Sequence, residues 1–257
     1  MTIENGPALP TSAAEPKPNS FGRIVGVLTA PTSTFEAIAK RPDVLVPLVV
    51  LMIFSLLANV LIARNIDFNS ITRQAIEDSQ SGSSQQMTAE QMDRAVRFGG
   101  AIAKAMTYAA PVLQLIVLAA IAGLLLIAFR MFGGEGDYRQ AFSIATYSWY
   151  PLVINGVIAM IVLLSRKSIS VADLRSPVRS NLGFLVDMKT HPFGSAILSS
   201  LDVFSFWSIA LLIIGFAAMS RLSKGKAAAI VLTYWILYIG IFKMTGAALQ
   251  AMRMKAS

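Results

Sequence analysis

The apolar residues of this chain are gathered into five long runs that are separated by polar segments. A helix needs about 18 to 20 apolar residues to cross the hydrocarbon core of a bilayer, and each run approaches or exceeds that length. The pattern therefore predicts an all-α integral membrane protein, a bundle of about five transmembrane helices. The predicted spans cover residues 44–63, 110–129, 145–164, 203–219 and 227–242.

A shorter amphipathic segment, residues 21–40, precedes the first span. Pro31 divides it, and Ser33 with Glu36 three residues later resembles a capping box that would begin a second helical piece. Two interpretations stay open: the segment lies along the membrane surface, or it packs on the bundle as ordinary helices. Apolar residues at helical spacing support both, namely Phe21, Ile24, Val25 and Leu28.

Two long segments between the spans are too small and too polar to form a domain of their own. Residues 78–86 are a polar, low-complexity stretch that predicts a flexible loop, and Thr88 begins a second capping-box pattern that predicts a helix after it. Prolines and glycines break residues 165–200 into short pieces. We therefore expect one membrane domain over residues 41–246.

The two ends of the chain have the composition of tails. Residues 1–20 are rich in proline, serine and threonine and lack the basic-then-apolar order of a signal peptide, so we expect a disordered tail there. Residues 247–257 are expected to form a C-terminal tail.

The composition excludes several classes of protein. Of the 257 residues, 55% are hydrophobic and only 14% are charged, far from the roughly one-quarter charged residues of soluble domains. The net charge of +8 comes from basic residues scattered beside the spans, which indicates contact with anionic lipid and not with nucleic acid. The chain has no cysteine, so disulfides and thiolate metal sites are excluded.

The distribution of Lys and Arg gives two conflicting indications of orientation. The raw count places more basic residues on the side opposite the N-terminus, but short loops carry the most weight. The compact turn 221–226 holds three basic residues and no acid. We therefore expect a cytoplasmic N-terminus and an external C-terminus.

Residues for catalysis, metal binding or ion transport are scarce. His191 is the only histidine and lies in a predicted loop, where we expect a solvated side chain. Glu135 and Asp137 flank Gly136 after the second span and fit either a cation or lipid-headgroup site or, as we favour, a solvated turn. Asp202 fits the N-terminus of the fourth span. We expect no enzyme activity, no cofactor and no metal.

Polar residues inside the spans are expected to join helices. Gln114 and Asn155 would hydrogen-bond between neighbours. Pro151 should free a turn of backbone that the hydroxyl of Ser148 or Tyr147 re-satisfies.

Three blocks of residues in a fixed order resemble the Yip1-domain membrane proteins of bacteria and archaea. The first block runs from Pro31 through Phe35 to Pro47. The second runs from Gly133 to Pro151, and the third from Asp202 to Ala227. Residues of these blocks, together with Asn155, are the family-motif or candidate interaction residues: Pro31, Phe35, Gly133, Gly134, Glu135, Gly136, Asp137, Tyr138, Tyr147, Pro151, Asn155, Asp202, Trp207 and Gly215.

The resemblance implies a five-helix membrane protein with a cytoplasmic N-terminus. Eukaryotic relatives act in vesicle trafficking with prenylated GTPases, but this chain lacks their acidic N-terminal motif, so that role is not carried over. We expect a membrane-organising factor in the cytoplasmic membrane of a prokaryote, with lipid, other membrane proteins or itself as partners. The alternatives are a permease or channel subunit for a small solute of unknown identity, and an accessory subunit for envelope biogenesis or lipid movement.

Overall fold

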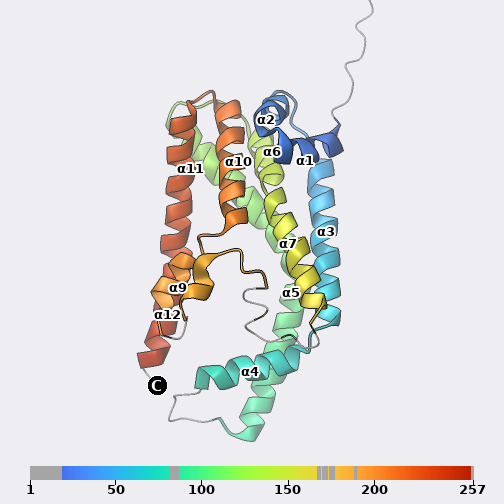
Figure 1. The fold of residues 1–257 in the computed structure, drawn as a ribbon, viewed down its shortest axis with the longest axis vertical. Coiled ribbons are helices and arrows are strands. Elements are labelled where there is room, and N and C mark those ends of the chain that lie inside the picture. Colours follow the sequence, from blue (N-terminus) through green and yellow to red (C-terminus); the bar gives the residue numbers. More distant parts are fainter. Residues whose placement is uncertain are drawn as a thin grey trace, which may run out of the picture.

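The computed structural model describes residues 19–80, 87–166, 169, 173, 177–187 and 190–255. Within these ranges, five helices are long and apolar enough to cross a membrane, as predicted, and they stand side by side in one bundle (Figure 1). The expected N-terminal tail up to residue 18 and loop residues 81–86 lie outside the described residues. The five helices are Leu45–Arg64, Ala89–Met131, Tyr138–Leu164, Val203–Ser220 and Lys224–Met252.

The first span, α3 (Leu45–Arg64), matches the predicted range to within one residue, whereas the second is much longer than predicted. Helix α5 (Ala89–Met131) has 43 residues and so a length of about 64 Å, twice the thickness of a hydrocarbon core. It begins at the predicted capping box, in which the Gln91 N–H donates to Thr88 Oγ1 at 3.3 Å. The hydropathy pattern marks only the apolar part of this helix, residues 110–129. Pro111 lies inside the helix and does not end it.

The third span consists of α6 (Tyr138–Ser148) and α7 (Tyr150–Leu164), which meet at Trp149. The prediction that Ser148 or Tyr147 compensates for Pro151 is wrong. Ser148 Oγ is buried without a hydrogen-bond partner among the described residues, and the Tyr147 hydroxyl bonds to Asp43 instead. The chain tightens its backbone at the junction, where the Trp149 N–H donates to the Thr146 carbonyl at 3.2 Å.

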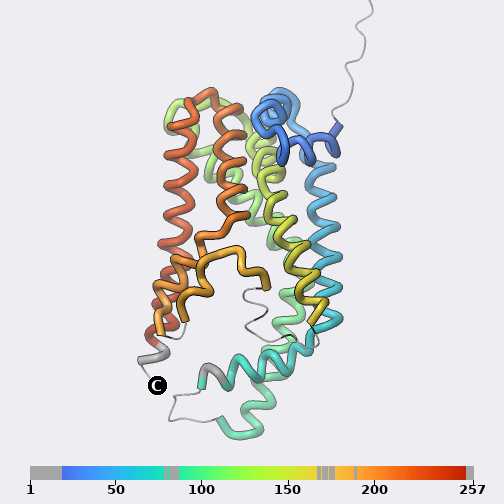
Figure 2. The backbone as a smooth tube through the Cα atoms, in the orientation of Figure 1, coloured from blue at the N-terminus to red at the C-terminus, as the bar shows by residue number. Residues whose placement is uncertain are grey.

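The last two spans form a hairpin of α10 (Val203–Ser220) and α11 (Lys224–Tyr238). Helix α11 continues through a π-helical turn, η2 (Ile239–Lys243), into α12 (Met244–Lys255). The described part of the predicted C-terminal tail is therefore helical. The smooth backbone trace follows this path to the C-terminus (Figure 2).

The N-terminal segment folds over one end of the bundle as α1 (Ser20–Thr29) and α2 (Pro31–Lys40) (Figure 1). Helix α2 packs on the bundle, because Phe35 and Ile38 are fully buried, whereas Phe21 and Val25 of α1 are exposed. That the segment also lies along the membrane surface stays a prediction. The capping box predicted at Ser33 is wrong. Pro31 already begins α2, so the Ser33 hydroxyl lies in the first turn and donates to the Ala30 carbonyl at 3.3 Å.

At the opposite end, α4 (Phe68–Gln80) crosses α5 (Figure 1). Two glycines of α5 allow this close crossing, since a Cβ at Gly100 would lie 2.3 Å from Asn69 Oδ1 and one at Gly99 would lie 2.8 Å from Thr72 Cγ2. Two short helical pieces, η1 (Leu182–Leu185) and α9 (Pro192–Leu198), precede α10.

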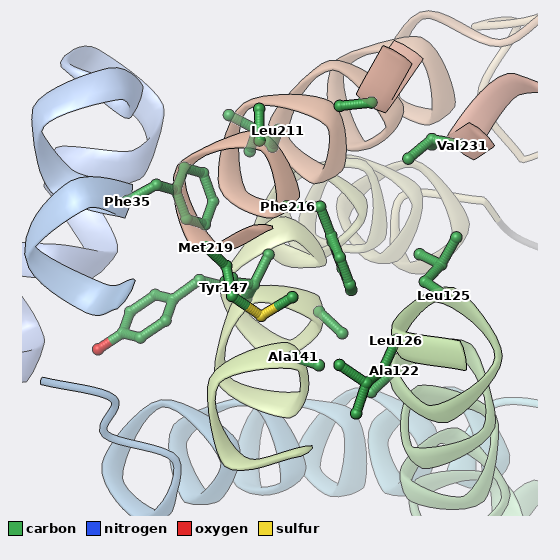
Figure 3. Packing of buried hydrophobic residues seen from close by; sticks show 14 of the residues in the cluster. Phe35, Ala122, Leu125, Leu126, Ala141, Tyr147, Leu211, Phe216, Met219 and Val231 are labelled. Atoms are coloured by element: carbon green, nitrogen blue, oxygen red, sulfur yellow. The ribbon is translucent and has the colours of Figure 1, made fainter. Parts of the chain in front are cut away.

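The tightest packing lies toward the end covered by α1 and α2. There, side chains from α2, α5, α6 and α10 belong to one hydrophobic cluster (Figure 3). In this cluster the rings of Phe129 and Phe216 lie 4.9 Å apart. Helix α10 is the most buried span, while α3 is the least buried. The hydrophobic core of the described residues therefore lies toward the capped end of the bundle.

Candidate functional site beneath the N-terminal cap

A buried polar network lies where the cap formed by α1 and α2 meets α6 and α7. The Tyr147 hydroxyl donates a 2.7 Å hydrogen bond to Asp43 Oδ2, and the guanidinium of Arg23 forms an ion pair with Asp43 Oδ1. The side chains of Arg23 and Asp43 are only 12% and 15% exposed. Their opposite charges compensate each other, which is what allows both to be held out of water.

The same network fixes the backbone between α2 and α3. Ser143 Oγ donates to the Asp43 carbonyl at 2.8 Å, and Gln140 Nε2 donates to the Ala39 carbonyl at 2.7 Å. Further along, the Tyr150 hydroxyl donates to the Pro47 carbonyl at 2.8 Å. The linker at Asp43 and the adjoining ends of α2 and α3 thereby gain hydrogen bonds to side chains of α6 and α7.

Arg23 adds a second layer of contacts from α1. Its guanidinium donates to the Arg41 carbonyl at 2.8 Å and to the Ala37 carbonyl at 3.1 Å, both near the end of α2. One side chain thus joins α1, the last turn of α2 and the carboxylate of Asp43. The planar fork of five N–H donors suits arginine to such a junction.

Sequence reasoning missed Arg23, Asp43, Gln140, Ser143 and Tyr150. A signal for three of them was available in the spacing of polar residues at i, i+3, i+7 and i+10, which places these residues along one helical face. Arg23 and Asp43 gave no such signal, because their pairing depends on how the cap folds back. The residues of the polar face are Gln140, Ser143, Tyr147 and Tyr150.

Three of the predicted residues, one from each block, meet at this site. Phe35 of α2 packs onto α10 at Gly215, where a Cβ would lie 2.9 Å from Phe35 Cδ1 and 2.4 Å from Ile144 Cγ2. Tyr147 belongs to the same hydrophobic cluster (Figure 3). Glycine is therefore required at position 215 by the close approach of α2 and α6.

The predicted glycine-rich turn connects α5 to α6 at the capped end. Gly133 and Gly136 adopt φ values of +83° and +123°, which side chains disfavour. The guanidinium of Arg130 donates to the Gly136 carbonyl at 2.7 Å and closes the turn. A Cβ at Gly134 would lie 2.8 Å from the Phe129 carbonyl oxygen, so this position also requires glycine.

Both carboxylates of this turn make structural contacts. Asp137 caps α6, since its Oδ1 accepts the Gln140 N–H at 2.8 Å, and the Gln140 side chain bonds back to the Asp137 N–H. Glu135 is paired with Arg221 at 3.2 Å, and its N–H donates to the Ser220 carbonyl at 3.1 Å. The α5–α6 turn is thereby docked on the α10–α11 turn.

The remaining predicted residues lie away from the network. Asp202 caps α10, because its Oδ1 accepts the Ser205 N–H at 2.9 Å, and it also accepts a bond from the Ser180 hydroxyl. The Tyr138 hydroxyl donates to the Ala119 carbonyl at 3.2 Å. The side-chain carbonyl oxygen of Asn155 is buried without a hydrogen-bond partner among the described residues, so this atom makes no interhelical bond to them. Trp207 is half-buried against the core.

The contacts of the polar network attach the cap to the bundle. In the described part of the chain, no three His, Asp or Glu side chains gather in a group that could hold a metal ion. Asp43, Asp137 and Asp202 each accept hydrogen bonds that fix a linker or the start of a helix. The network therefore positions the cap on the bundle.

Comparison with known proteins agrees with this architecture. The model of the Yip1 domain matches residues 25–244, which include the second half of α1, α2, the first four spans and most of the fifth. The chain is 26% identical over 239 residues to the protein named Membrane protein YknW of Bacillus subtilis (strain 168), covering 90% of this chain and 92% of that protein. No solved structure gives a significant match. With the match extending over most of its length, this integral membrane protein belongs to the Yip1 family.

Proposed function

We propose that this chain is a non-enzymatic membrane-organising protein that binds a partner membrane protein through its N-terminal cap. The observation that carries the proposal is the outer face of α1. Phe21 and Val25 are 65% and 61% exposed there, although Val27 on the inner side of the same helix is fully buried. Exposed apolar side chains on a firmly held element are typical of interaction sites.

The setting of α1 supports this role. The helix packs against α3, whose first residue, Leu45, is 74% exposed. The Arg23–Asp43 ion pair and the buried Phe35 keep the cap in place, so a partner would meet a surface that is already ordered. A pre-ordered surface costs less conformational entropy on binding.

The use of the acidic residues supports a binding role over catalysis or ion-coupled transport. Asp43 is occupied by Tyr147 and Arg23, while Asp137 and Asp202 cap helices. A proton- or ion-coupled transporter generally has ionisable groups free to face a cavity near the middle of the membrane.

We place the protein in the cytoplasmic membrane of a prokaryote, with the cap in the cytoplasm. The α10–α11 turn carries Arg221, Lys224 and Lys226 and lies at the same end of the bundle as α1 and α2 (Figure 1). Short basic loops favour the cytoplasmic side. With this orientation, the cap, the α5–α6 turn and the α10–α11 turn form one cytoplasmic face.

Site-specific photocrosslinking tests the proposal. A photoreactive amino acid at Phe21 or Val25 should capture one defined membrane protein in native membranes, identified by mass spectrometry. The matched control is the same probe at Leu249, which is 56% exposed on α12 and distant from the cap. With the probe at Phe21, capture should disappear when Val25 is changed to serine. With the probe at Val25, capture should disappear when Phe21 is changed to serine. Recovery of only lipid and the chain itself would overturn the proposal.

A further inference from the structure

Away from the cap, a groove of about 510 Å³ lies between α3, α5 and α7. Its volume falls within the range of roughly 300 to 1,000 Å³ that is usual for ligand sites. Most of its lining side chains are half-buried, so the groove is open to its surroundings and is not a sealed cavity. Trp149 lies toward one end, Phe54 faces Gly156 in the middle, and Phe68 and Ile71 of α4 lie toward the other end.

The groove is elongated. Its lining residues extend from Trp149, at the junction of α6 and α7, to Leu163 near the end of α7, which is about 21 Å at the helical rise of about 1.5 Å per residue. This length accommodates one extended hydrocarbon chain.

The position of the groove selects a lipid as the occupant. Its walls belong to three membrane-spanning helices, and one end reaches α4 at the edge of the bundle. One leaflet contributes about 15 Å of the roughly 30 Å hydrocarbon core. A groove of this length holds the chain of a lipid whose headgroup stays at the level of α4.

Most of the groove wall is apolar, and two of its polar side chains are satisfied within their own helices. Asn59 Nδ2 donates to the Ser55 carbonyl at 2.8 Å, and the Thr107 hydroxyl donates to the Ala103 carbonyl at 2.9 Å. These donors are satisfied by their own helices, so they need no hydrogen bond from an occupant. A hydrocarbon chain can therefore lie against them at little cost.

Two cations lie beside the α4 end of the groove without lining it. Lys104 follows the lining residue Ala103 on α5, and Arg97, two turns before Lys104, lines a neighbouring hollow between α4 and α5 together with Asp67 and Asp93. Neither cation forms an ion pair with any residue in the described ranges. The nearby acids have other partners, since Asp93 pairs with Arg73 at 2.5 Å and Asp67 accepts the N–H of Asn69 at 3.0 Å.

From these observations we infer that the α3–α5–α7 groove binds one acyl chain of an anionic phospholipid, with the phosphate beside Lys104 and Arg97. The charges select the headgroup, and the length and largely apolar wall of the groove suit an acyl chain. This site is distinct from the cap and does not depend on the identity of a protein partner.

A photoreactive phospholipid tests the inference directly. The protein is reconstituted in nanodiscs with phosphatidylglycerol that carries a diazirine at the end of one acyl chain, and the adducts are mapped by mass spectrometry after irradiation. Adducts should concentrate around Phe54, Trp149 and Val153. Phosphatidylcholine with the same chain should give a lower yield, by about fivefold for each cation that contributes. A diazirine fatty acid in a third arm distinguishes phospholipid from free acid.

Matched substitutions then test the groove itself. Ala159→Phe and Ala103→Phe place a ring in the groove, whereas Ala120→Phe adds the same ring to the exposed face of α5. In the two groove variants the yield of adducts at the groove should fall about tenfold, equivalent to about 1.4 kcal/mol, whereas in the control the yield should stay as in the wild type. Lys104→Gln combined with Arg97→Gln should abolish the preference for phosphatidylglycerol and leave the phosphatidylcholine yield unchanged.

Three results would overturn the inference. The first is an even spread of wild-type adducts over outward residues such as Leu57 and Ile116. The second is a groove yield that the two groove variants do not change. The third is that, in native membranes, the groove is crosslinked to another protein and not to lipid. The wild-type map decides the question even if a phenylalanine variant fails to fold, which size-exclusion chromatography and circular dichroism would reveal.

Discussion

The hydroxyl of Tyr147 on α6 donates a 2.7 Å hydrogen bond to the carboxylate of Asp43, which lies 104 residues earlier in the chain. The same carboxylate pairs with Arg23 of α1, so one acidic group connects the cap, the linker into the first span and the third span. Comparing a substitution of Asp43 with one of Tyr147 should separate the contribution of the ion pair from that of the hydrogen bond donated by the phenol.

We expect Asp43→Asn to destabilise the protein by about 3 to 5 kcal/mol, because Arg23 would stay largely buried without its counter-charge. Tyr147→Phe should cost less, about 1.5 to 3 kcal/mol, since it removes one hydrogen bond to a charged group. Unfolding followed by circular dichroism in nanodiscs measures both. An Asp43→Asn variant as stable as the wild type would show that the network does not hold the cap.

Gly215 and Gly225 form a matched pair for testing the packing of the cap. A methyl group at Gly215 would meet Phe35 and Ile144 at less than 3.0 Å, whereas at Gly225 nothing lies within 4 Å. Gly215→Ala should destabilise the fold by about 1 to 3 kcal/mol, the usual cost of overpacking. Gly225→Ala lies in the first turn of α11 and should be neutral or stabilise by up to about 1 kcal/mol.

Unfolding followed by circular dichroism in nanodiscs also compares Gly215→Ala with Gly225→Ala. A second change, Phe35→Leu, should restore part of the stability lost in Gly215→Ala, because it removes ring atoms that face the new methyl group. Equal stability of the two alanine variants would contradict the close approach of α2 to α10.

The glycines of the α5–α6 turn should differ in their tolerance of side chains. Gly136 has φ of +123° and a Cβ there would lie 2.7 Å from Met219 Cγ, while Gly133 has φ of +83° with open space around it. Gly136→Ala should therefore cost about 1 to 3 kcal/mol. Gly133→Asn should cost less than about 1 kcal/mol, since asparagine tolerates the left-handed region. Midpoints of unfolding in the same nanodiscs provide the comparison, and a reversed order would contradict the turn geometry.

Local sequence rules predicted the elements of this fold better than their contacts. The length of the apolar runs located every span, and the Thr88 capping box located the start of α5, because both signals lie within a few neighbouring residues. The Ser33–Glu36 capping box failed for a local reason as well: Pro31 is a stronger helix start, and it displaced the cap to Ala30.

The site was predicted only in part, since its pairings join distant segments. Phe35, Tyr147 and Gly215 were identified through the family resemblance, and each lies at the site. Asp43 and Arg23 carry no spacing signal, and their roles depend on the cap folding back across the bundle. The groove could not be predicted either, because its walls come from three separate helices.

Orientation in the membrane is open to a direct test, because the chain contains no cysteine. Met87 is 44% exposed beside the start of α5, and Gly225 lies at the opposite end of the bundle in the α10–α11 hairpin (Figure 1). With a cytoplasmic N-terminus, Met87→Cys should react with an impermeant maleimide in intact cells. Gly225→Cys should react only after the membrane is permeabilised. The reverse pattern would invert the orientation and leave the five spans intact, whereas labelling of both from one side would contradict the number of spans between them.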